Sequence, residues 1–309
     1  MIDNMTIKLG GHRGFGCTDH DFYQDKRDIA SLPVENTLAS IKAAFEAGAD
    51  YVETDAVMSA DGVIFALHNV VPKDHFFAAD MPADLLNKMP FDAIGAYHAG
   101  RYQNGVLARM SDILDYIATI DPATLPWAVN IEIKGVQGSG QNYEENDYLK
   151  NLARLVEQSA LPVERVLFSS FSLENIIRMS HLLPQAKYGM LFADQQDARG
   201  IYSNYRDNPR FQYLPFNADH ADLVINIWQQ EAQRDAKLEY AHPEIMTVTP
   251  DMVSYAAKRH LGLNVWALFE KPDQDRMAYY RNTALCADEK NVPFTAITDY
   301  IADMQKPAY

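Results

Sequence analysis

The sequence YVETDAVMSADGVIFALH, residues 51–68, contains two runs of strand-forming residues, Tyr51–Val57 and Val63–His68. Only a few residues separate these runs, too few for a helical crossover between parallel strands. The connecting residues include Asp61-Gly62, a dipeptide typical of tight hairpin turns. The segment is therefore predicted to form an antiparallel hairpin.

This hairpin is predicted to bring acidic and imidazole side chains together. If Asp61 and Gly62 are the two turn residues, Asp55 lies directly opposite His68, and directly opposed side chains share a face of the sheet. Glu53 lies on the same face because side chains alternate along a strand with a period of two. Local geometry alone thus predicts two carboxylates and one imidazole close together.

Elsewhere in the chain, short β-rich runs alternate with helix-length amphipathic runs, the pattern of an α/β fold with a largely parallel sheet. The expected strands are Thr6–Gly11, Tyr51–Val57, Val63–His68, Trp127–Lys134, Arg165–Ser169, Tyr188–Phe192, Ile245–Thr249, Asn264–Leu268 and Thr295–Thr298. The expected helices include Thr37–Ala47, Ser111–Ala118, Leu149–Ser159, Ser172–Leu182 and Pro250–His260. Gly48 and Gly262 are expected to mark the ends of two of these helices. An eight-stranded barrel needs one strand fewer, so at least one predicted strand is peripheral or wrong.

Composition excludes several classes of protein. The 309 residues are 48% hydrophobic and contain no linker-like stretch, which favours one large domain. The net charge of −15, without a basic cluster, argues against nucleic acid or anionic membranes as partners. No segment is apolar for long enough to span a bilayer, and the N-terminus does not resemble a secretory signal, so a cytoplasmic location is expected. Cys17 and Cys286 are expected to be ordinary thiols.

Four short segments place polar residues within or beside apolar strands. They are GGHRGF (Gly10–Phe15), VETDA (Val52–Ala56), FALHN (Phe65–Asn69) and VNIEIKG (Val129–Gly135). In the last segment Asn130, Glu132 and Lys134 alternate with apolar residues, as they would on a strand with one face to solvent. Because this run has the composition of a central barrel strand, inward-facing polar groups there need partners or ligands. Glu132 and Lys134 are therefore expected to be functional, with a structural salt bridge as the alternative.

These residue types suit phosphodiester hydrolysis. Glu53, Asp55 and Glu132 offer hard oxygen ligands without sulfur, which favours Mg²⁺ or Ca²⁺ over zinc. The imidazoles of His12 and His68 titrate near neutral pH and are suited to proton transfer. Positively charged side chains to bind the phosphate are also present: Arg13 offers a planar fork and Lys134 a point charge.

Taken in order, the motifs resemble the glycerophosphodiester phosphodiesterase family. They are HRG at His12–Gly14, ENT at Glu35–Thr37, E-x-D at Glu53–Asp55, DG at Asp61–Gly62, His68, E-x-K at Glu132–Lys134, SSF at Ser169–Phe171, VWAL at Val265–Leu268 and ITD at Ile297–Asp299. The resemblance covers nearly the whole chain. It implies one irregular (β/α)₈ TIM barrel over residues 1–309, of the phospholipase C-like phosphodiesterase type, with the site at the carboxyl ends of the strands. The implied reaction is metal-dependent hydrolysis of a small glycerophosphodiester to glycerol phosphate and an alcohol.

The resemblance also implies a role for each matching residue. Glu53, Asp55 and Glu132 would bind the metal, His12 and His68 would act as acid and base, and Arg13 and Lys134 would hold the phosphate. Glu35 would approach the metal or orient Arg13, unless it only serves the start of a helix. Phe171 and Trp266 would line the substrate groove, although core packing explains either residue equally well.

Three features depart from the family pattern. The chain has His68-Asn69 where the family usually has His-Asp, and the sequence after His68 is also unusual. The segment Gly16–Leu32 is longer than expected and is predicted to lie beside the site. Within it, Asp19, His20 and Asp21 are conceivable extra ligands, but a solvated loop is the favoured interpretation.

Two other functions fit many of the same residues. A related barrel that releases a cyclic phosphate from a lysophospholipid or sphingolipid would share His12, Glu53, Asp55 and His68. Glu35 and its ENT motif favour the glycerol diester instead. A barrel that only binds phosphate ligands is disfavoured because each proposed catalytic position has a competent residue. The leaving alcohol, the choice of metal and the oligomeric state do not follow from the sequence.

Overall fold

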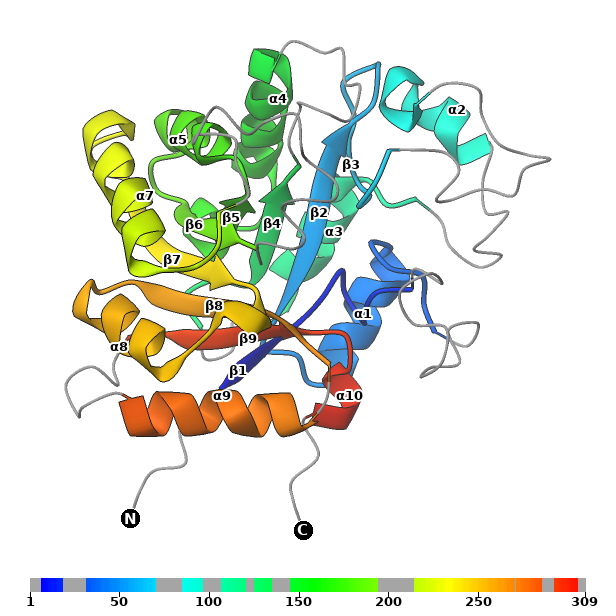
Figure 1. Cartoon of the computed structure of the whole chain (residues 1–309). Coiled ribbons are helices and arrows are strands. Elements are labelled where there is room, and N and C mark those ends of the chain that lie inside the picture. The colour runs from blue at the N-terminus through cyan, green and yellow to red at the C-terminus, as the bar shows by residue number, and fades with distance from the viewer. Residues whose placement is uncertain are drawn as a thin grey trace.

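The computed structural model describes residues 7–18, 32–70, 85–96, 107–120, 125–134, 145–193, 214–269, 271–284 and 292–304. Eight parallel strands form a closed barrel in the order β1-β2-β4-β5-β6-β7-β8-β9, and β1 pairs with both β2 and β9 (Figure 1). Their bounds are β1 (Lys8–Gly11), β2 (Tyr51–Met58), β4 (Val129–Ile133), β5 (Val166–Ser170), β6 (Lys187–Phe192), β7 (Lys237–Pro243), β8 (Gly262–Leu268) and β9 (Phe294–Thr298). This architecture confirms the predicted TIM barrel.

Strand β3 (Ile64–Ala66) is the peripheral ninth strand, and it pairs antiparallel with β2. The hairpin exists, but the predicted two-residue turn is wrong. Ser59 pairs with Val63, so three residues, 60–62, form the loop, and Gly62 adopts the left-handed φ of 83° typical of such loops. The register therefore places Leu67 opposite Asp55, whose carbonyl accepts a 3.2 Å hydrogen bond from the Leu67 amide. His68 lies beyond the paired residues, at a bend.

The predicted strand Ile245–Thr249 is also wrong. Residues Ile245–Thr247 form the 3₁₀ helix η6, closed by a 2.9 Å hydrogen bond from the Thr247 amide to the Glu244 carbonyl. The barrel strand at this point is β7, with the sequence KLEYAHP. This strand was not predicted because it contains Lys237, Glu239 and Pro243, residue types that are depleted in β-sheets. Thr249 caps the helix that follows.

Helices surround the barrel (Figure 1). Their bounds are α1 (Leu38–Glu46), α2 (Phe91–Ala96), α3 (Met110–Ala118), α4 (Glu145–Gln158), α5 (Leu173–Leu182), α7 (Ala218–Glu231), α8 (Pro250–Lys258), α9 (Lys271–Ala284) and α10 (Ile301–Met304), with short 3₁₀ helices η3 (Leu86–Lys88) and η4 (Val163–Arg165). Gly48, at φ 93°, follows α1 as predicted. The left-handed residue after α8 is His260, not Gly262, which instead begins β8. Within the described residues, none of the helices combines the length and apolar content needed to cross a membrane.

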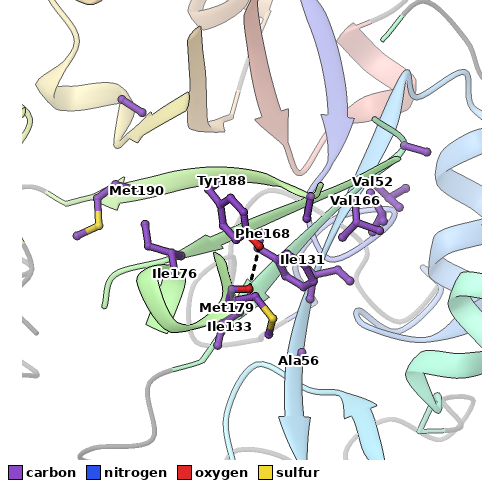
Figure 2. Packing of buried hydrophobic residues seen from close by; sticks show 14 of the residues in the cluster. Val52, Ala56, Ile131, Ile133, Val166, Phe168, Ile176, Met179, Tyr188 and Met190 are labelled. Atoms are coloured by element: carbon purple, nitrogen blue, oxygen red, sulfur yellow. Dashed lines mark hydrogen bonds between the residues drawn. The ribbon is translucent and has the colours of Figure 1, made fainter. Parts of the chain in front are cut away.

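The main core fills the space between the barrel and its helices. Outward-facing residues of β2, β4 and β5, including Val52, Ile131 and Phe168, pack in one layer with Met179 of α5 and Tyr188 of β6 (Figure 2). The Tyr188 hydroxyl donates a 3.1 Å hydrogen bond to the Met179 carbonyl, so its one polar group is satisfied inside this layer. Because strand side chains alternate, the residues between these point into the barrel.

An aromatic plug fills the amino-terminal part of the barrel interior. It comprises Tyr51, Trp127, Leu167, Tyr240 and Ile297. Hydrogen bonds tie its polar edges, from the Trp127 indole to the Tyr240 hydroxyl at 2.9 Å and from the Tyr51 hydroxyl to Asn264 Oδ1 at 2.5 Å. Gly10 makes room for it, since a Cβ there would lie 2.0 Å from the Tyr51 ring. Inward-facing residues closer to the carboxyl ends of the strands therefore lie above this plug.

Gly10→Ala is expected to destabilise the protein by about 1–3 kcal/mol, because the added methyl overpacks a ring that is already held by a hydrogen bond. Gly95→Ala is the matched control, because none of the described residues lies within 4 Å of the new Cβ and alanine favours the helix. Urea unfolding of both variants measures the difference. Equal stability of Gly10→Ala and wild type would contradict this account of the plug.

Candidate active site

Three carboxylates converge above the plug. Glu53 and Asp55 follow Tyr51 on the inward face of β2, and Glu132 of β4 is in register with Asp55. One oxygen from each carboxylate lies within 4.8 Å of the others. The arrangement offers hard oxygen donors to a single cation at the carboxyl ends of the strands.

The three carboxylates of this cluster have shifted pKa values. Burial and the neighbouring Asp55 raise the pKa of Glu53 to about 8, and burial raises the pKa of Glu132 despite the nearby Lys134. Burial would also raise the pKa of Asp55, but Lys134, His68 and Arg13 outweigh it and hold that pKa well below its usual range. Close buried carboxylates repel one another unless a positive charge is shared among them.

Lys134 supplies part of that positive charge. Its Nζ lies 2.7 Å from Asp55 Oδ1 and 2.8 Å from Glu132 Oε1. Burial would lower the pKa of Lys134, but these two carboxylates outweigh it and raise the pKa above the usual value. The contacts are those of the salt bridge that the sequence left as an alternative.

The HRG turn places Arg13 beside the cluster. Arg13 has a left-handed φ of 49°, and its backbone amide donates a 2.9 Å hydrogen bond to Glu53 Oε2. Its Nη1 donates at 2.7 Å to Glu35, whose other oxygen accepts from the Thr18 amide. Burial would raise the pKa of Glu35, but the Arg13 charge outweighs it and lowers that pKa. Of the arrangements expected for Glu35, this contact with Arg13 is the one observed.

The sequence placed Asn36, with Glu35, in a motif at the edge of the site but did not predict what Asn36 contacts. At φ 56° its side chain turns back onto β2, where Nδ2 donates to Asp55 Oδ2 at 2.7 Å. Its Oδ1 accepts from the Thr54 hydroxyl and from the Asp55 amide. Asn36 therefore fixes the Asp55 carboxylate. The ENT motif was the available signal, but a motif does not reveal which atoms it holds.

His12 is held by Asp299, a residue whose role the sequence did not predict. His12 Nδ1 lies 2.8 Å from Asp299 Oδ1, and the same oxygen accepts the Cys17 amide at 2.6 Å. His12 Nε2 faces the carboxylate cluster, 4.0 Å from Glu53 Oε2. Burial would lower the pKa of His12, but the Asp299 carboxylate outweighs it and raises the pKa. The ITD motif ends with this aspartate, although nothing in the sequence connects it with a histidine 287 residues earlier.

His68 completes the set in a different electrostatic setting. Burial and the positive charges of Arg13 and Lys134 lower the pKa of His68 well below its usual value, and Asp55 only partly opposes them. The pKa values of the two imidazoles are thus shifted in opposite directions. Such opposite shifts allow one site to hold one protonated and one neutral histidine.

Two aromatic residues lie at the same end of the barrel. Phe171 directly follows β5, and Trp266 lies within β8, two residues before its end. Their rings meet edge to face with centroids 5.7 Å apart. Both are partly exposed, and the Trp266 indole donates to the His242 carbonyl at 2.8 Å. Asp19, His20, Asp21 and Cys286 lie outside the described residues.

Comparison with known proteins shows the family of the chain. Residues 12–292 match the sequence model of the Glycerophosphoryl diester phosphodiesterase family. A glycerophosphodiester phosphodiesterase from Caldanaerobacter subterraneus subsp. tengcongensis is 23% identical over 255 residues, which are 81% of this chain and 86% of the relative.

Solved structures share the fold. A Silicibacter pomeroyi protein described by the same family name has a TM-score of 0.68 and 19% identity, over 97% of this chain and 92% of that one. An Oleispira antarctica phosphodiesterase, solved with the product sn-glycerol-3-phosphate, has a TM-score of 0.62 and 15% identity, over 96% and 95%. Since the family match spans residues 12–292 of 309, the chain belongs to the glycerophosphoryl diester phosphodiesterase family of phosphodiester hydrolases.

Proposed function

We propose that this protein hydrolyses glycerophosphodiesters to glycerol phosphate and an alcohol, with Mg²⁺ or Ca²⁺ bound by Glu53, Asp55 and Glu132. The observation that carries the proposal is the convergence of these carboxylates within 4.8 Å, at the end of the barrel where two histidines and two cationic side chains also lie. The related phosphodiesterase solved with sn-glycerol-3-phosphate supports the choice of product.

The residues present fit a hard divalent cation. All three donors are carboxylate oxygens, and burial together with the neighbouring carboxylate of Asp55 raises the pKa values of Glu53 and Glu132 although Lys134 lies nearby. A bound cation would favour their ionised forms. When bound, the cation would supply positive charge that stabilises the negative charge of the reacting phosphate.

In this proposal the histidines divide the proton transfers. The lowered pKa of His68 keeps its imidazole neutral and therefore free to accept a proton. As a water oxygen attacks phosphorus, His68 accepts the water proton. As the bond from phosphorus to the alcohol oxygen breaks, His12 Nε2 donates a proton to the departing alkoxide, because the pKa of His12 is raised by Asp299. Asp299 keeps the Nδ1 proton directed at itself and leaves Nε2 facing the reaction.

The cationic and aromatic residues would bind substrate. Arg13, oriented by Glu35, would contact the phosphate. Lys134 pairs with Asp55 and Glu132 in the structure, and with those carboxylates ligated its ammonium would be available to a phosphate oxygen. Phe171 and Trp266 would line the groove for the organic part of the substrate.

Removal of divalent cations is expected to abolish hydrolysis of sn-glycero-3-phosphocholine, and Mg²⁺ or Ca²⁺ should restore it. Glu132→Gln should weaken binding of the activating cation by roughly 10-fold or more, since mutation of residues that only support metal ligands already lowers metal affinity by that factor. ³¹P NMR of the reaction identifies the product. A cyclic phosphate would favour the rival lyase, and full activity after exhaustive chelation would refute the metal site.

His12→Ala and His68→Ala are each expected to lower kcat by about 10²–10⁴-fold, the usual contribution of a positioned general acid or base. Affinity for the metal should change much less. Single-turnover measurements with saturating cation isolate the chemical step. Near-normal turnover in both variants would show that neither imidazole transfers a proton.

Two carboxyl changes are expected to shift opposite limbs of the pH profile. Asp299→Asn removes the charge that raises the pKa of His12, so activity that needs protonated His12 should be lost at lower pH. Asn69→Asp should raise the pKa of His68 if its carboxylate approaches the ring, and activity that needs neutral His68 should then appear only at higher pH.

The control for these pH profiles is Asp50→Asn. Asp50 accepts hydrogen bonds from Lys8 and from the Leu9 amide at the amino end of β1, far along the strand from the site. Its loss should alter stability without moving either limb. If Asp299→Asn leaves the alkaline limb in place, the assignment of His12 as acid is wrong.

A further inference from the structure

We propose that Asn130, Ser169 and His242 form a neutral polar floor that binds the hydroxyl groups of the substrate's glycerol moiety. This inference rests on the proposed function and specifies part of the same site. It begins from side chains that the mechanism above leaves unused.

The three residues face into the barrel beside the carboxylates. Asn130 is in register with Glu53, and Ser169 is in register with Glu132, so each shares the inward face of a proposed metal ligand. His242 lies two residues beyond Tyr240 of the aromatic plug and therefore also points inward. All three are fully buried.

Each of these side chains has polar atoms without a hydrogen-bond partner among the described residues. They are Nδ2 and Oδ1 of Asn130, Oγ of Ser169 and Nε2 of His242. Folded proteins satisfy nearly all buried polar atoms, either internally or through water or a ligand. Such atoms on three strands of one barrel interior indicate a shared polar occupant.

The hydrogen bonds around His242 determine which of its ring nitrogens carries the proton. Asn264 Oδ1 accepts from the Tyr51 and Thr295 hydroxyls, so the Asn264 amide nitrogen is the atom that donates to His242 Nδ1, at 3.4 Å. Burial lowers the pKa of His242 to about 3, so the ring is neutral and its proton lies on Nε2. His242 is thus a buried donor in need of an acceptor.

Gly189 brings this donor next to Ser169. A Cβ at Gly189 would lie 2.3 Å from His242 Nε2, so only glycine admits the ring here. Gly189 pairs directly with Ser169 on β5. Asn130 is the diagonal neighbour of Ser169, because it pairs with Leu167. The three side chains therefore form a row along neighbouring strands from β4 through β5 to β7, with Gly189 of β6 between Ser169 and His242.

The chemistry of this row fits a hydroxyl oxygen. None of the three residues carries a charge, so the row provides nothing to neutralise a phosphate. Serine and asparagine can both donate and accept, and His242 donates, which suits groups that do both. Water and an alcohol share this chemistry. Asn130 and Ser169 are in register with proposed metal ligands, and the His242 carbonyl accepts a hydrogen bond from the Trp266 indole. The row thus borders the proposed metal site and the proposed substrate groove, which favours the polyol end of the substrate.

Ser169→Ala and His242→Phe test the floor, with two substrates that differ only in the proposed contact. The substrates are sn-glycero-3-phosphocholine and propyl phosphocholine, in which a propyl group replaces glycerol. The ratio of kcat/KM for the glycerol diester to that for the propyl diester is expected to fall about tenfold in each variant, the effect of one lost hydrogen bond. A ratio equal to that of wild type would overturn the proposal and leave water as the occupant.

The control is Ser180→Ala, another fully buried serine, which lies on α5 outside the barrel. Its hydroxyl donates to the Ile177 carbonyl and accepts from the Gln233 amide. Its ratio should match wild type. If His242→Phe fails to fold by circular dichroism, Ser169→Ala still decides the question.

Calorimetry separates failure of the floor from failure of the proposed function. Binding of sn-glycerol 3-phosphate and propyl phosphate, measured with Mg²⁺, needs no turnover. If wild type cleaves neither diester yet prefers sn-glycerol 3-phosphate and loses that preference in Ser169→Ala, the proposed reaction is wrong and the floor stands. Equal binding of the two ligands by wild type would overturn the floor.

Discussion

The buried negative charge of Asp55 is the constraint on which the site depends. The side chain is 1% exposed, and three segments that are distant in sequence converge on it. Asn36 and Lys134 each approach an Asp55 oxygen at 2.7 Å, and Arg13 Nε lies 3.6 Å away. An unpaired carboxylate would be costly at this depth, so the charge itself helps to order the HRG turn, the ENT motif and the end of β4.

Closure of the barrel supplies what these local contacts cannot. Strand β1 pairs with β9 as well as β2, which places His12 between Asp299 from the end of the chain and Glu53 from its first quarter. The aromatic plug then fills the amino-terminal part of the interior, where Asn264 and Thr295 have their polar groups satisfied by hydrogen bonds. The charged inward-facing residues lie closer to the carboxyl ends, where active sites of this architecture lie.

The sequence predicted whatever depends on short-range pattern and missed what depends on register or distance. Alternation along β2 and β4 was enough to group Glu53, Asp55 and Glu132, because neighbouring parallel strands in register do the rest. The predicted register of the hairpin was wrong by one residue, since the turn composition did not distinguish a two-residue loop from a three-residue loop. β7 was missed because Lys237, Glu239 and Pro243 are residue types that are depleted in strands. The partners Asp299 and Asn36 became evident only in three dimensions, where strand closure and a left-handed turn aim them.

The charge around the site is negative, which is consistent with the proposed divalent cation. Five carboxylates gather there, from Glu35, Glu53, Asp55, Glu132 and Asp299, against the two permanent cations Arg13 and Lys134. Even with Glu53 protonated, as its pKa of about 8 favours at neutral pH, and with His12 positively charged, four negative charges oppose three positive ones. A phosphodiester is itself an anion, so the residues alone would bind it weakly. A divalent cation on the three converging carboxylates, with Glu53 ionised as a ligand, would bring the site to five negative and five positive charges. A neutral floor could then select the organic group without disturbing that balance.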